Sequence, residues 1–503
     1  MNENDSMNRR NFLKAVGFGA AALVGPAGLG LEQAASAARR ESRKLNFVFF
    51  LIDDLGWADL GCYGSTFYET PNIDKLASEG MRFTDAYAAC PVCSPTRASI
   101  MTGKYPARLG ITQWIGGPNE PTPYLHQLPL EEVTIAEALK EAGYATGFVG
   151  KWHLAPPGQD NVADFYPDHQ GFDVNIGGDS SGAPPTYFWP YEKKRRLETL
   201  PPGGQEGEYL TDRLTDESLK FLETNRDKPF LLYLSHYAVH MPIEAKPAMI
   251  EKYQTKAGEL PETEGPKFVT MYDRYKTRQV QDNPVYAGMV QSVDECVGRV
   301  LKKLDELGVA DSTAIIFMSD NGGLSTVPRE GPTCNLPLRA GKGWLYEGGI
   351  REPMFIKWPG VVRPGSVCSE PVTSTDFYPT MLQMAGLPLK PKQHVDGVSL
   401  VPLLKGDGKL KRQAIYWHYP HYHGSGNKPS AAVRAGDYKL IEWYEDNSVE
   451  LYNLKDDIGE LHDLAGRMPE KAVELRGLLN RWLKQVKAAV PTPEQLKGFQ
   501  DKQ

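Results

Sequence analysis

Four apolar segments of the sequence are each followed by polar residues that could bind a metal ion or transfer protons. These residues are Asp53 and Asp54, Lys151 and His153, His240, and Asp320 and Asn321. Taken one at a time, such residues more often form turns or helix caps than binding sites. In an open α/β sheet, however, ligands bind beyond the carboxyl ends of the strands. We therefore expect these side chains to meet at one edge of a sheet.

The combined set has the chemistry of a site for a hard cation and an anion. Asp53, Asp54 and Asp320 supply carboxylates and Asn321 supplies an amide oxygen, an oxygen-only set that suits Ca²⁺ or Mg²⁺ rather than zinc. The positive charges and proton donors come from Lys151, His153, His240 and a later residue, Lys342. The alternative is that the histidines are core residues and the lysines are solvated surface charges. Together the residues favour an oxyanion ester as the substrate.

The segment from Cys93 to Lys104, CSPTRASIMTGK, resembles the signature of the type I sulfatases, which are arylsulfatase A-like members of the alkaline phosphatase superfamily. In that family the C-x-P-S/T-R core directs oxidation of the cysteine to formylglycine. The resemblance continues in family order through Asp53-Asp54, Gly150-Lys151-Trp152-His153, His240-Met241-Pro242, Asp320-Asn321-Gly322 and Lys342. It spans nearly the whole mature chain. Without it, Cys93 would be interpreted as a buried small residue, a half-cystine or a redox partner of Cys90.

The resemblance implies a formylglycine-dependent sulfatase with bound Ca²⁺. It implies a catalytic set of Cys93, Arg97, Lys151, His153, His240 and Lys342. It implies metal ligands at Asp53, Asp54, modified residue 93, Asp320 and Asn321. The hydrated aldehyde would attack sulfur, with Arg97 holding the diol and His240 or Lys342 donating a proton to the leaving alcohol. His153 would then remove a proton from the second hydroxyl, so that the aldehyde re-forms and expels sulfate.

The substrate is less closely specified than the reaction. Export and the lack of a lipid anchor favour a sulfated carbohydrate as the substrate. Galactose sulfate or N-acetylgalactosamine sulfate is the first candidate and an aryl sulfate the next. A sulfated carbohydrate substrate would place the protein in polysaccharide degradation. Candidate sugar-binding residues lie in loops rich in polar and aromatic residues: His169, Asp173, Tyr187, His421 and His423. One alternative is a phosphodiesterase or phosphonate monoester hydrolase of the same superfamily. Another is a sugar-binding protein that has lost catalysis.

The order of apolar and amphipathic segments predicts an α/β fold. Buried strands are expected at Leu45–Ile52, Ala145–Val149, Phe230–Leu234 and Ala314–Met318. Helices are expected at Val133–Ala142 and Val290–Leu307, each followed by glycine. This alternation indicates a large mixed, mostly parallel sheet sandwiched by helices. The resemblance implies the alkaline-phosphatase-like version of this fold.

A smaller α+β domain is expected at the C-terminus. Strands at Ala432–Trp443 and Val449–Leu454 and a helix at Pro469–Ala488 indicate a small antiparallel sheet with a terminal helix. We therefore predict a catalytic domain over residues 44–390 and a C-terminal domain over 391–503. Residues 154–210 and 240–285 are predicted to be loop-rich and to form pocket walls.

Residues 1–37 have the features of a twin-arginine signal peptide. Arg9 and Arg10 precede a glycine- and alanine-rich run, and Ala35-Ser36-Ala37 suits a signal peptidase. The run is too short and glycine-rich for a stable membrane span; the alternative is an uncleaved anchor. We therefore predict a periplasmic or extracellular protein. Because this pathway exports folded proteins, a formylglycine-generating maturation enzyme could act before export.

Bulk composition excludes some classes of protein. With 503 residues, 41% hydrophobic and 24% charged, the chain is an ordinary globular protein large enough for more than one domain. A net charge of −7 without a long basic run excludes a nucleic-acid partner. Six cysteines are too few for a disulfide scaffold, although one or two bridges would be possible outside the cytoplasm.

Overall fold

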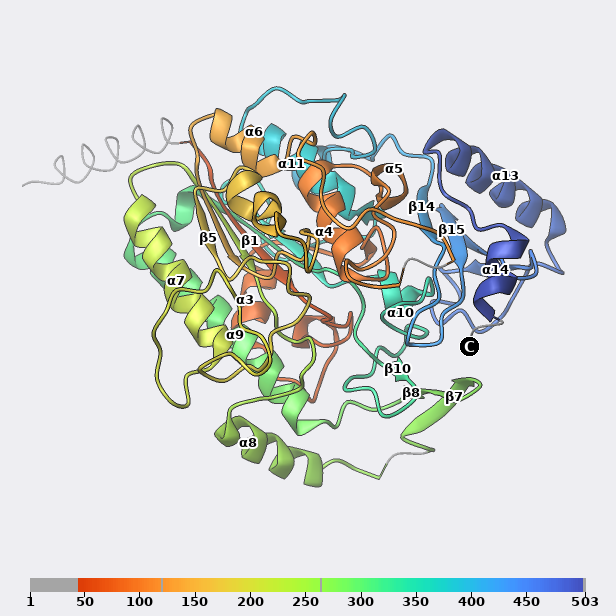
Figure 1. Ribbon diagram of the computed structural model, residues 1–503, viewed down its shortest axis with the longest axis horizontal. Coiled ribbons are helices and arrows are strands. Elements are labelled where there is room, and N and C mark those ends of the chain that lie inside the picture. The colour runs from red at the N-terminus through yellow and green to blue at the C-terminus, as the bar shows by residue number, and fades with distance from the viewer. Residues whose placement is uncertain (1–43, 119–120, 263–264, 501–503) are drawn as a thin grey trace, which may run out of the picture. The chain divides into compact units, whose positions relative to one another are not determined.

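An eight-stranded sheet carries the residues that the sequence places after strands (Figure 1). The computed structural model describes residues 44–118, 121–262 and 265–500. The strand order is β12-β2-β11-β9-β1-β6-β4-β5. In that order the strands are β12 (Ser366–Cys368), β2 (Met81–Phe83), β11 (Met354–Lys357), β9 (Thr313–Ser319), β1 (Asn46–Ile52), β6 (Phe230–Ser235), β4 (Ala145–Gly150) and β5 (Val174–Ile176).

The centre of this sheet is parallel. β1 pairs in parallel with β6 and β9, and β4 pairs in parallel with β5 and β6. Near the other edge, β11 runs antiparallel to both β9 and β2. The predicted mixed, mostly parallel sheet is therefore confirmed, as are its four predicted strands, whose ends shift by only one residue.

Helices cover both faces of the sheet because β1 is apolar on both faces (Figure 1). Phe47, Phe49 and Leu51 pack in a core with α4 (Cys93–Thr102), α6 (Ile135–Glu141) and α11 (Phe377–Met384). The alternate residues, Val48 and Phe50 among them, pack in a second core with α3 (Pro71–Ser78), α7 (Leu210–Asn225) and α9 (Pro284–Glu306). A strand buried on both faces reads as a continuous apolar run, as the sequence does here.

The ends of the predicted helices follow their capping residues. Helix α6 begins after Thr134, whose side chain forms a capping box with Glu137. Helix α9 begins six residues before the predicted start at Val290, because the Asn283 side chain accepts hydrogen bonds from the first turn and Pro284 occupies the first helical position. Apolar periodicity alone does not reveal such a start.

A four-stranded antiparallel sheet lies near the C-terminus. Its order is β14 (Ile415–Tyr419), β15 (Ser430–Ala435), β16 (Tyr438–Trp443) and β17 (Val449–Asn453). Leucines of α13 (Pro469–Gln485) pack on it. The predicted segment Ala432–Trp443 is therefore two strands, joined at Gly436 with φ 59°, and β14 was not predicted. The domain boundary at residue 390 stays a prediction.

The predicted loop-rich region 240–285 contains regular structure. It holds α8 (Pro247–Gly258) and the hairpin of β7 (Phe268–Tyr272) and β8 (Tyr275–Arg278), which pairs with β10 (Thr326–Val327). The loop prediction was wrong there.

The remaining elements are β3 (Ala86–Tyr87), β13 (Val372–Thr373), α5 (Pro106–Leu109), α10 (Glu347–Ile350), α12 (Val401–Leu404), α14 (Pro493–Gln500), and the 3-10 turns η1 (Gly61–Tyr63), η2 (Val162–Phe165), η3 (Pro167–His169), η4 (Ala310–Ser312) and η5 (Ser374–Asp376).

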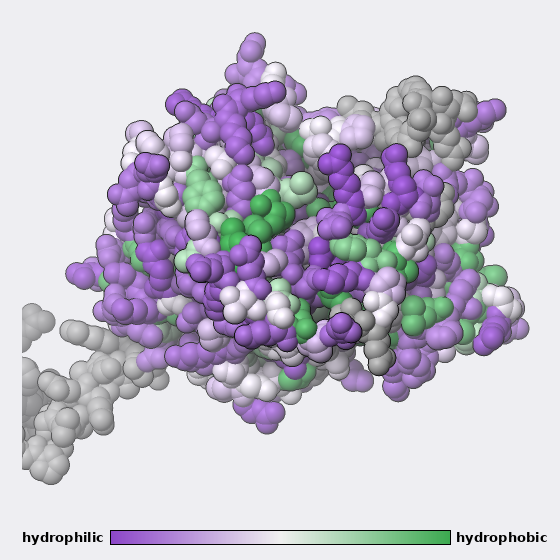
Figure 2. All heavy atoms as spheres, turned by 90° about the horizontal axis from the view of Figure 1, so that it is seen from below, coloured by the Kyte–Doolittle hydropathy of each residue, from purple (hydrophilic) through white to green (hydrophobic). Residues whose placement is uncertain are grey.

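The surface and the N-terminus bear on the predicted location of the protein. The twin-arginine signal predicted at residues 1–37 lies outside the described residues. Within the described ranges, no helix has the length and apolar character needed to cross a membrane. The face in Figure 2 is mainly hydrophilic, with small separate hydrophobic patches.

A fully buried charge cluster joins the C-terminal sheet to the segment around α10. Lys439 of β16 lies 2.9 Å from both Glu347 and Glu460, and all three side chains are solvent-inaccessible. Burial opposes ionisation of Glu347, yet Lys439 and Arg351 lower its pKa to about 2. Burial raises the pKa of Glu460 to about 7. Lys439 is thus the cation that both carboxyl groups share.

We expect Lys439→Met to lower the free energy of unfolding by about 3 kcal/mol, because it leaves buried Glu460 without its cation and Glu347 with Arg351 in place of two cations. Urea unfolding at neutral pH measures this loss. The double variant Lys439→Met/Glu460→Gln should recover part of it, since glutamine carries no charge. Exposed Lys455→Ala serves as the control, with a change within about 0.5 kcal/mol. A loss below that size for Lys439→Met would contradict this account.

Candidate active site

The carboxyl ends of β9, β1, β6 and β4 bring the predicted polar residues together. These four strands are adjacent and parallel, so the residues that follow them lie at one edge of the sheet. Asp54 and His153 follow their strands with φ values of 61° and 57°. Residues other than glycine seldom adopt this left-handed conformation, which is often found at functional sites. The sharp bends turn both side chains out of the direction of the strands.

Asp53 and Lys151 form a completely buried ion pair. Lys151 Nζ lies 2.6 Å from Asp53 Oδ2, and neither side chain is exposed. The other carboxylate oxygen, Oδ1, is buried without a hydrogen-bond donor among the described residues. Burial and the negative charge of Asp320 raise the pKa of Asp53 well above its usual value. A further positive charge beside Oδ1 would stabilise the carboxylate.

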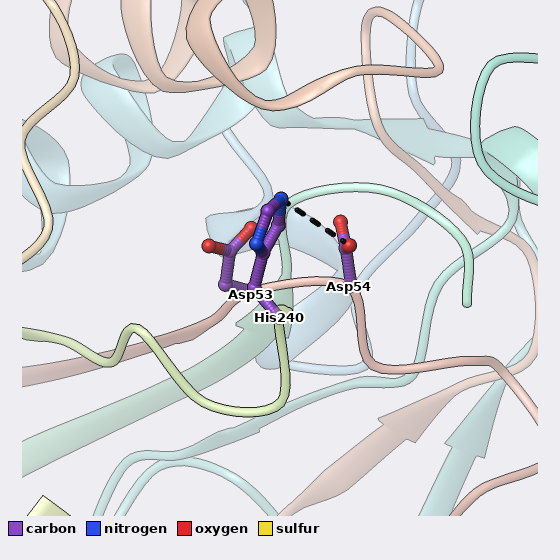
Figure 3. A group of neighbouring side chains, drawn as sticks. All are labelled: Asp53, Asp54 and His240. Atoms are coloured by element: carbon purple, nitrogen blue, oxygen red, sulfur yellow. Dashed lines mark ion pairs between the residues drawn. The ribbon is translucent and has the colours of Figure 1, made fainter. Parts of the chain in front are cut away.

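Lysine, asparagine and histidine side chains surround Asp54. Lys342 Nζ lies 2.6 Å from Asp54 Oδ1, which also accepts a hydrogen bond of 2.8 Å from Asn321 Nδ2. His240 Nε2 lies 3.7 Å from Oδ2 (Figure 3). Although burial opposes it, the charge of Lys342 lowers the pKa of Asp54. The same ion pair outweighs the effect of burial on Lys342 and raises its pKa, so that both groups are charged.

Arg97 is held by several acceptors. Its Nε and Nη2 groups donate to Asp320 Oδ2 at 2.9 and 2.7 Å, and Nη1 donates to the Lys151 carbonyl and to Ser235 Oγ. Nη2 is also 3.8 Å from Asp53 Oδ1. The guanidinium therefore fixes Asp320 and the start of the loop after β4. The resemblance implied that Arg97 holds the diol of residue 93, whereas its hydrogen bonds to Asp320 were not predicted.

Cys93 begins α4 and faces a histidine. Its Sγ lies 3.3 Å from His153 Nδ1, while His153 Nε2 lies 2.9 Å from the Ile115 carbonyl oxygen. Since a carbonyl can only accept, Nε2 carries the proton and Nδ1 presents its lone pair to residue 93. Burial and the charge of Lys151 lower the pKa of His153 well below its usual value. His153 is thus a neutral base directed at residue 93.

Cys90 and Cys93 do not form a redox pair in this structure. All six cysteines lie within the described residues and all are free thiols. Burial raises the pKa of the Cys90 thiol, which disfavours the thiolate that disulfide exchange requires. The Cys90 carbonyl instead accepts a hydrogen bond of 2.9 Å from Thr96 Oγ1. None of these six cysteines forms a disulfide bridge, although the predicted export would permit one or two bridges.

The residues present fit a hard divalent cation. Asp53 Oδ1 and Asn321 Oδ1 are buried oxygens without donors among the described residues, which a cation would satisfy. Asp53, Asp54 and His240 also offer ligand atoms that lie within 4.8 Å of one another (Figure 3). His240 Nδ1 lies 2.9 Å from the Met241 carbonyl oxygen, so a neutral ring presents its Nε2 lone pair toward Asp54. The Lys342 ammonium, 2.6 Å from Asp54 Oδ1, offsets this approach of two acceptors, and a bound cation would do so further.

A cavity of about 560 Å³ opens onto this site. Its lining includes Asp54, Cys93, His153, His240 and Lys342. Further lining residues come from separate loops: Trp114, Ser180, Gly182, Ala183, Arg195, Met241, Leu324 and Gly424. Those within 154–210, together with Met241, lie in the regions predicted to form pocket walls, whereas Trp114, Leu324 and Gly424 were not predicted. The sequence held one signal for Arg195, because it lies in the basic run 193–196. A cavity of this size suits a small organic group.

The five predicted sugar-binding residues are dispersed. Among them, His423 lines the cavity, whereas His421 is buried with its Nε2 2.9 Å from Thr112 Oγ1. His169 is exposed beside Asp168, and Asp173 forms an ion pair of 2.8 Å with Lys140. Neither lines the cavity. The loops that carry His169 and Asp173 turn away from the strand ends. Membership of a polar loop was therefore not enough to identify the residues that line the pocket.

Tyr187 supports the site from beneath. It is fully buried, and its hydroxyl donates to the carbonyls of Tyr237 and His240 at 2.7 and 2.8 Å. A buried ring with a donating hydroxyl cannot contact a sugar, so direct sugar binding by Tyr187 is contradicted. These hydrogen bonds instead fix the backbone that carries His240.

Family comparisons agree with the site geometry. A model of the sulfatase family matches residues 45–387, and a model of the C-terminal region of N-sulphoglucosamine sulphohydrolase matches 340–489. A sulfatase from Formosa agariphila is 32% identical over 96% of this chain and 95% of its own. Human arylsulfatase A is 32% identical over 87% of both chains. Mouse N-acetylgalactosamine-6-sulfatase is 34% identical over 80% of this chain and 73% of its own.

Solved structures share the fold. Ps i-CgsB in complex with k-i-k-neocarrahexaose is 31% identical, with a TM-score of 0.71 over 88% of this chain and 93% of that chain. The phosphonate monoester hydrolase of Agrobacterium radiobacter, at 21% identity and a TM-score of 0.59 over 88% of this chain and 95% of its own, shares the fold alone. The predicted fold class is thereby confirmed. The chain belongs to the sulfatase family of the alkaline phosphatase superfamily and is a sulfuric ester hydrolase.

Proposed function

We propose that this protein removes sulfate from a sulfated carbohydrate, using a formylglycine made from Cys93 and a Ca²⁺ ion. One observation carries the proposal: buried Cys93 begins a helix at the base of the cavity and faces the lone pair of His153 Nδ1 at 3.3 Å. Asp53, Asp54, residue 93, Asp320 and Asn321 would hold the ion, as the unsatisfied oxygens of Asp53 and Asn321 support.

The two added groups supply what the unmodified side chains lack. A hydrated formylglycine supplies a geminal diol nucleophile, and Ca²⁺ supplies positive charge to an anionic ester. His153, neutral and anchored to the Ile115 carbonyl, accepts a proton at Nδ1. This proton transfer from residue 93 lets sulfate leave without attack of water on sulfur. The position of residue 93 at the start of α4 adds free backbone N–H groups that favour negative charge.

Charged side chains at the base of the cavity would bind the ester and help the alcohol to leave. Lys342 lines the cavity and remains protonated beside Asp54, so it offers charge to a sulfate oxygen. Burial and the charge of Lys342 lower the pKa of His240. A bound anionic ester opposes that effect, which couples protonation of His240 to substrate binding. His240 would then donate its proton to the leaving oxygen, while Lys151 stabilises Asp53 from within the protein.

A sugar is favoured as the leaving group. The mouse relative is an N-acetylgalactosamine-6-sulfatase, and a second solved relative, 25% identical with a TM-score of 0.68 over 89% of this chain and 99% of its own, was crystallised with D-glucosamine-2-N,6-O-disulfate. In this chain, half-buried Trp114 forms an aromatic wall of the cavity, a surface that suits a sugar ring. We therefore propose a galactose or N-acetylgalactosamine sulfate as the substrate and polysaccharide degradation as the context.

The other proposals concern location and maturation. We propose that residues 1–37 direct export by the twin-arginine route to the periplasm or beyond, and that a formylglycine-generating enzyme modifies Cys93 before export. The phosphonate monoester hydrolase alternative has only shared fold in its favour. The binding-protein alternative does not explain why Cys93 and His153 face each other beside the buried carboxylates.

The deciding experiment is turnover by wild type and Cys93→Ala. We expect wild type to hydrolyse 4-nitrophenyl sulfate and N-acetylgalactosamine 6-sulfate faster than the phosphate esters, and Cys93→Ala to lose about 10³-fold or more in kcat. Cys90→Ala, a buried thiol without a proposed role, is the matched control. Peptide mass spectrometry should find residue 93 as an aldehyde. Equal activity of Cys93→Ala and wild type would exclude the mechanism.

Calcium should stabilise the protein whether or not residue 93 is modified. After removal of metal by a chelator, Ca²⁺ at about 100 times its Kd should add about 2.7 kcal/mol to the free energy of unfolding. Thermal unfolding with and without Ca²⁺ measures this. Asn321→Ala should weaken the response, whereas Asp168→Asn, an exposed carboxylate outside the cavity, should retain it. An unchanged Tm in the wild type at millimolar Ca²⁺ would rule out the site.

Tyr187→Phe tests whether the buried hydroxyl positions His240. We expect kcat to fall by about tenfold with little change in KM, because the backbone under His240 loses its anchor while the cavity wall is unchanged. The free energy of unfolding should fall by about 1 kcal/mol. Steady-state kinetics and urea unfolding provide these values. A rise in KM with constant kcat would instead indicate a role in substrate binding.

A further inference from the structure

Two cations line the active-site cavity, and they have different partners. Lys342 is paired with Asp54 at 2.6 Å. Arg195 is exposed, and its Nη2 donates to the Ala183 carbonyl at 2.7 Å. Among the described residues, no carboxylate lies within ion-pair distance of Arg195. Its positive charge is therefore not neutralised within the cavity.

The position of Arg195 is linked to the catalytic base. Its carbonyl acceptor belongs to Ala183, and the preceding residue, Gly182, packs directly on His153. A Cβ atom at Gly182 would lie only 2.5 Å from His153 Cε1. Because adjacent residues are about 3.8 Å apart, the guanidinium lies within about 13 Å of the His153 ring. A substrate group bound by Arg195 would therefore belong to the sugar that carries the hydrolysed sulfate or to the adjacent sugar.

Arg195 also belongs to a concentration of positive charge. Residues 193–196 read Lys-Lys-Arg-Arg in a chain whose net charge is −7, and all four are exposed. Lys193 is paired with Glu244 at 3.2 Å. A local run of like charge costs stability through repulsion, and at the mouth of a cavity it attracts anions. An alternative is that the run is simply a solvated part of the surface. That alternative does not explain why the Arg195 guanidinium lines the cavity and is anchored to the Ala183 carbonyl.

We propose that Arg195 binds a second anionic group of the substrate, so that the natural substrate is a glycan with at least two anionic groups. This inference rests on the proposed function and narrows it. The guanidinium fork presents several N–H groups to a planar carboxylate or to sulfate oxygens. The hydrolysed ester lies over residue 93, and the second group, a further sulfate or a uronate carboxylate, is bound at the mouth by Arg195.

The test compares substrates that differ only in the second anion. They are N-acetylgalactosamine 6-sulfate, its 4,6-disulfate, and the 6-sulfated disaccharide that carries a uronate. For Arg195→Ala we expect kcat/KM to fall 10- to 100-fold on whichever two-anion substrate carries the recognised group, and less than about twofold on the monosulfate. Lys194→Ala, which removes the same charge outside the cavity, should change each value less than about twofold. The disulfate and uronate arms distinguish the source of the second anion.

Binding to protein that cannot turn over separates this inference from the proposed function. In a Cys93→Ala background, calorimetric titration with the same saccharides should show a 10- to 100-fold loss of affinity for the preferred two-anion sugar when Arg195→Ala is added. This loss is expected even if wild type hydrolyses no sulfate ester. An equal loss on all three saccharides would assign Arg195 to positioning the loop under His153. Equal loss and absence of loss both overturn the proposal.

Discussion

The constraint on which the site depends is the burial of three carboxylates at one edge of a parallel sheet. Asp53, Asp54 and Asp320 are each almost inaccessible to solvent. An isolated buried carboxylate is costly, so each needs a cation within hydrogen-bonding distance. Lys151, Lys342 and Arg97 supply these cations at 2.6 to 2.7 Å. The three negative and three positive side chains balance.

This balance determines what the site can bind. With all six side chains ionised the set is neutral, so a bound divalent cation would favour the ionised form of Asp53 and make the site net positive by two charges. An anionic ester is then attracted to a water-poor location where electrostatic interactions are strong. The two buried oxygens without donors among the described residues, on Asp53 and Asn321, would give such a cation a defined place. The same ion pairs that stabilise the fold therefore prepare the site for its substrate.

The positions of residues that follow strand ends were predictable from the sequence. The roles of residues that depend on tertiary packing were not. Asp53, His153 and Asp320 follow apolar runs that could only be buried strands, so their convergence follows from the parallel sheet. The partners of Arg97 depend on which side chains meet across the sheet, and sequence spacing does not encode them. Tyr187 was assigned to the wall because it lies in an aromatic loop, although its ring is buried under His240. Arg195 lies in the region 154–210 that was predicted to form a pocket wall, but it was not singled out, because position in a loop does not show which side chains reach the cavity.

Reaction and specificity are carried by different parts of the chain. The reacting groups sit on strand ends and on the start of α4, where packing on both sides fixes them. Trp114, Arg195 and His423 reach the same cavity from three separate loops, and loops over a rigid sheet can change without disturbing the chemistry below. Relatives about one third identical can therefore share sulfate ester hydrolysis and differ in the ester they select. For this chain the sheet edge defines the reaction, and under the proposed function the charge and aromatic surface of the cavity mouth would select the ester.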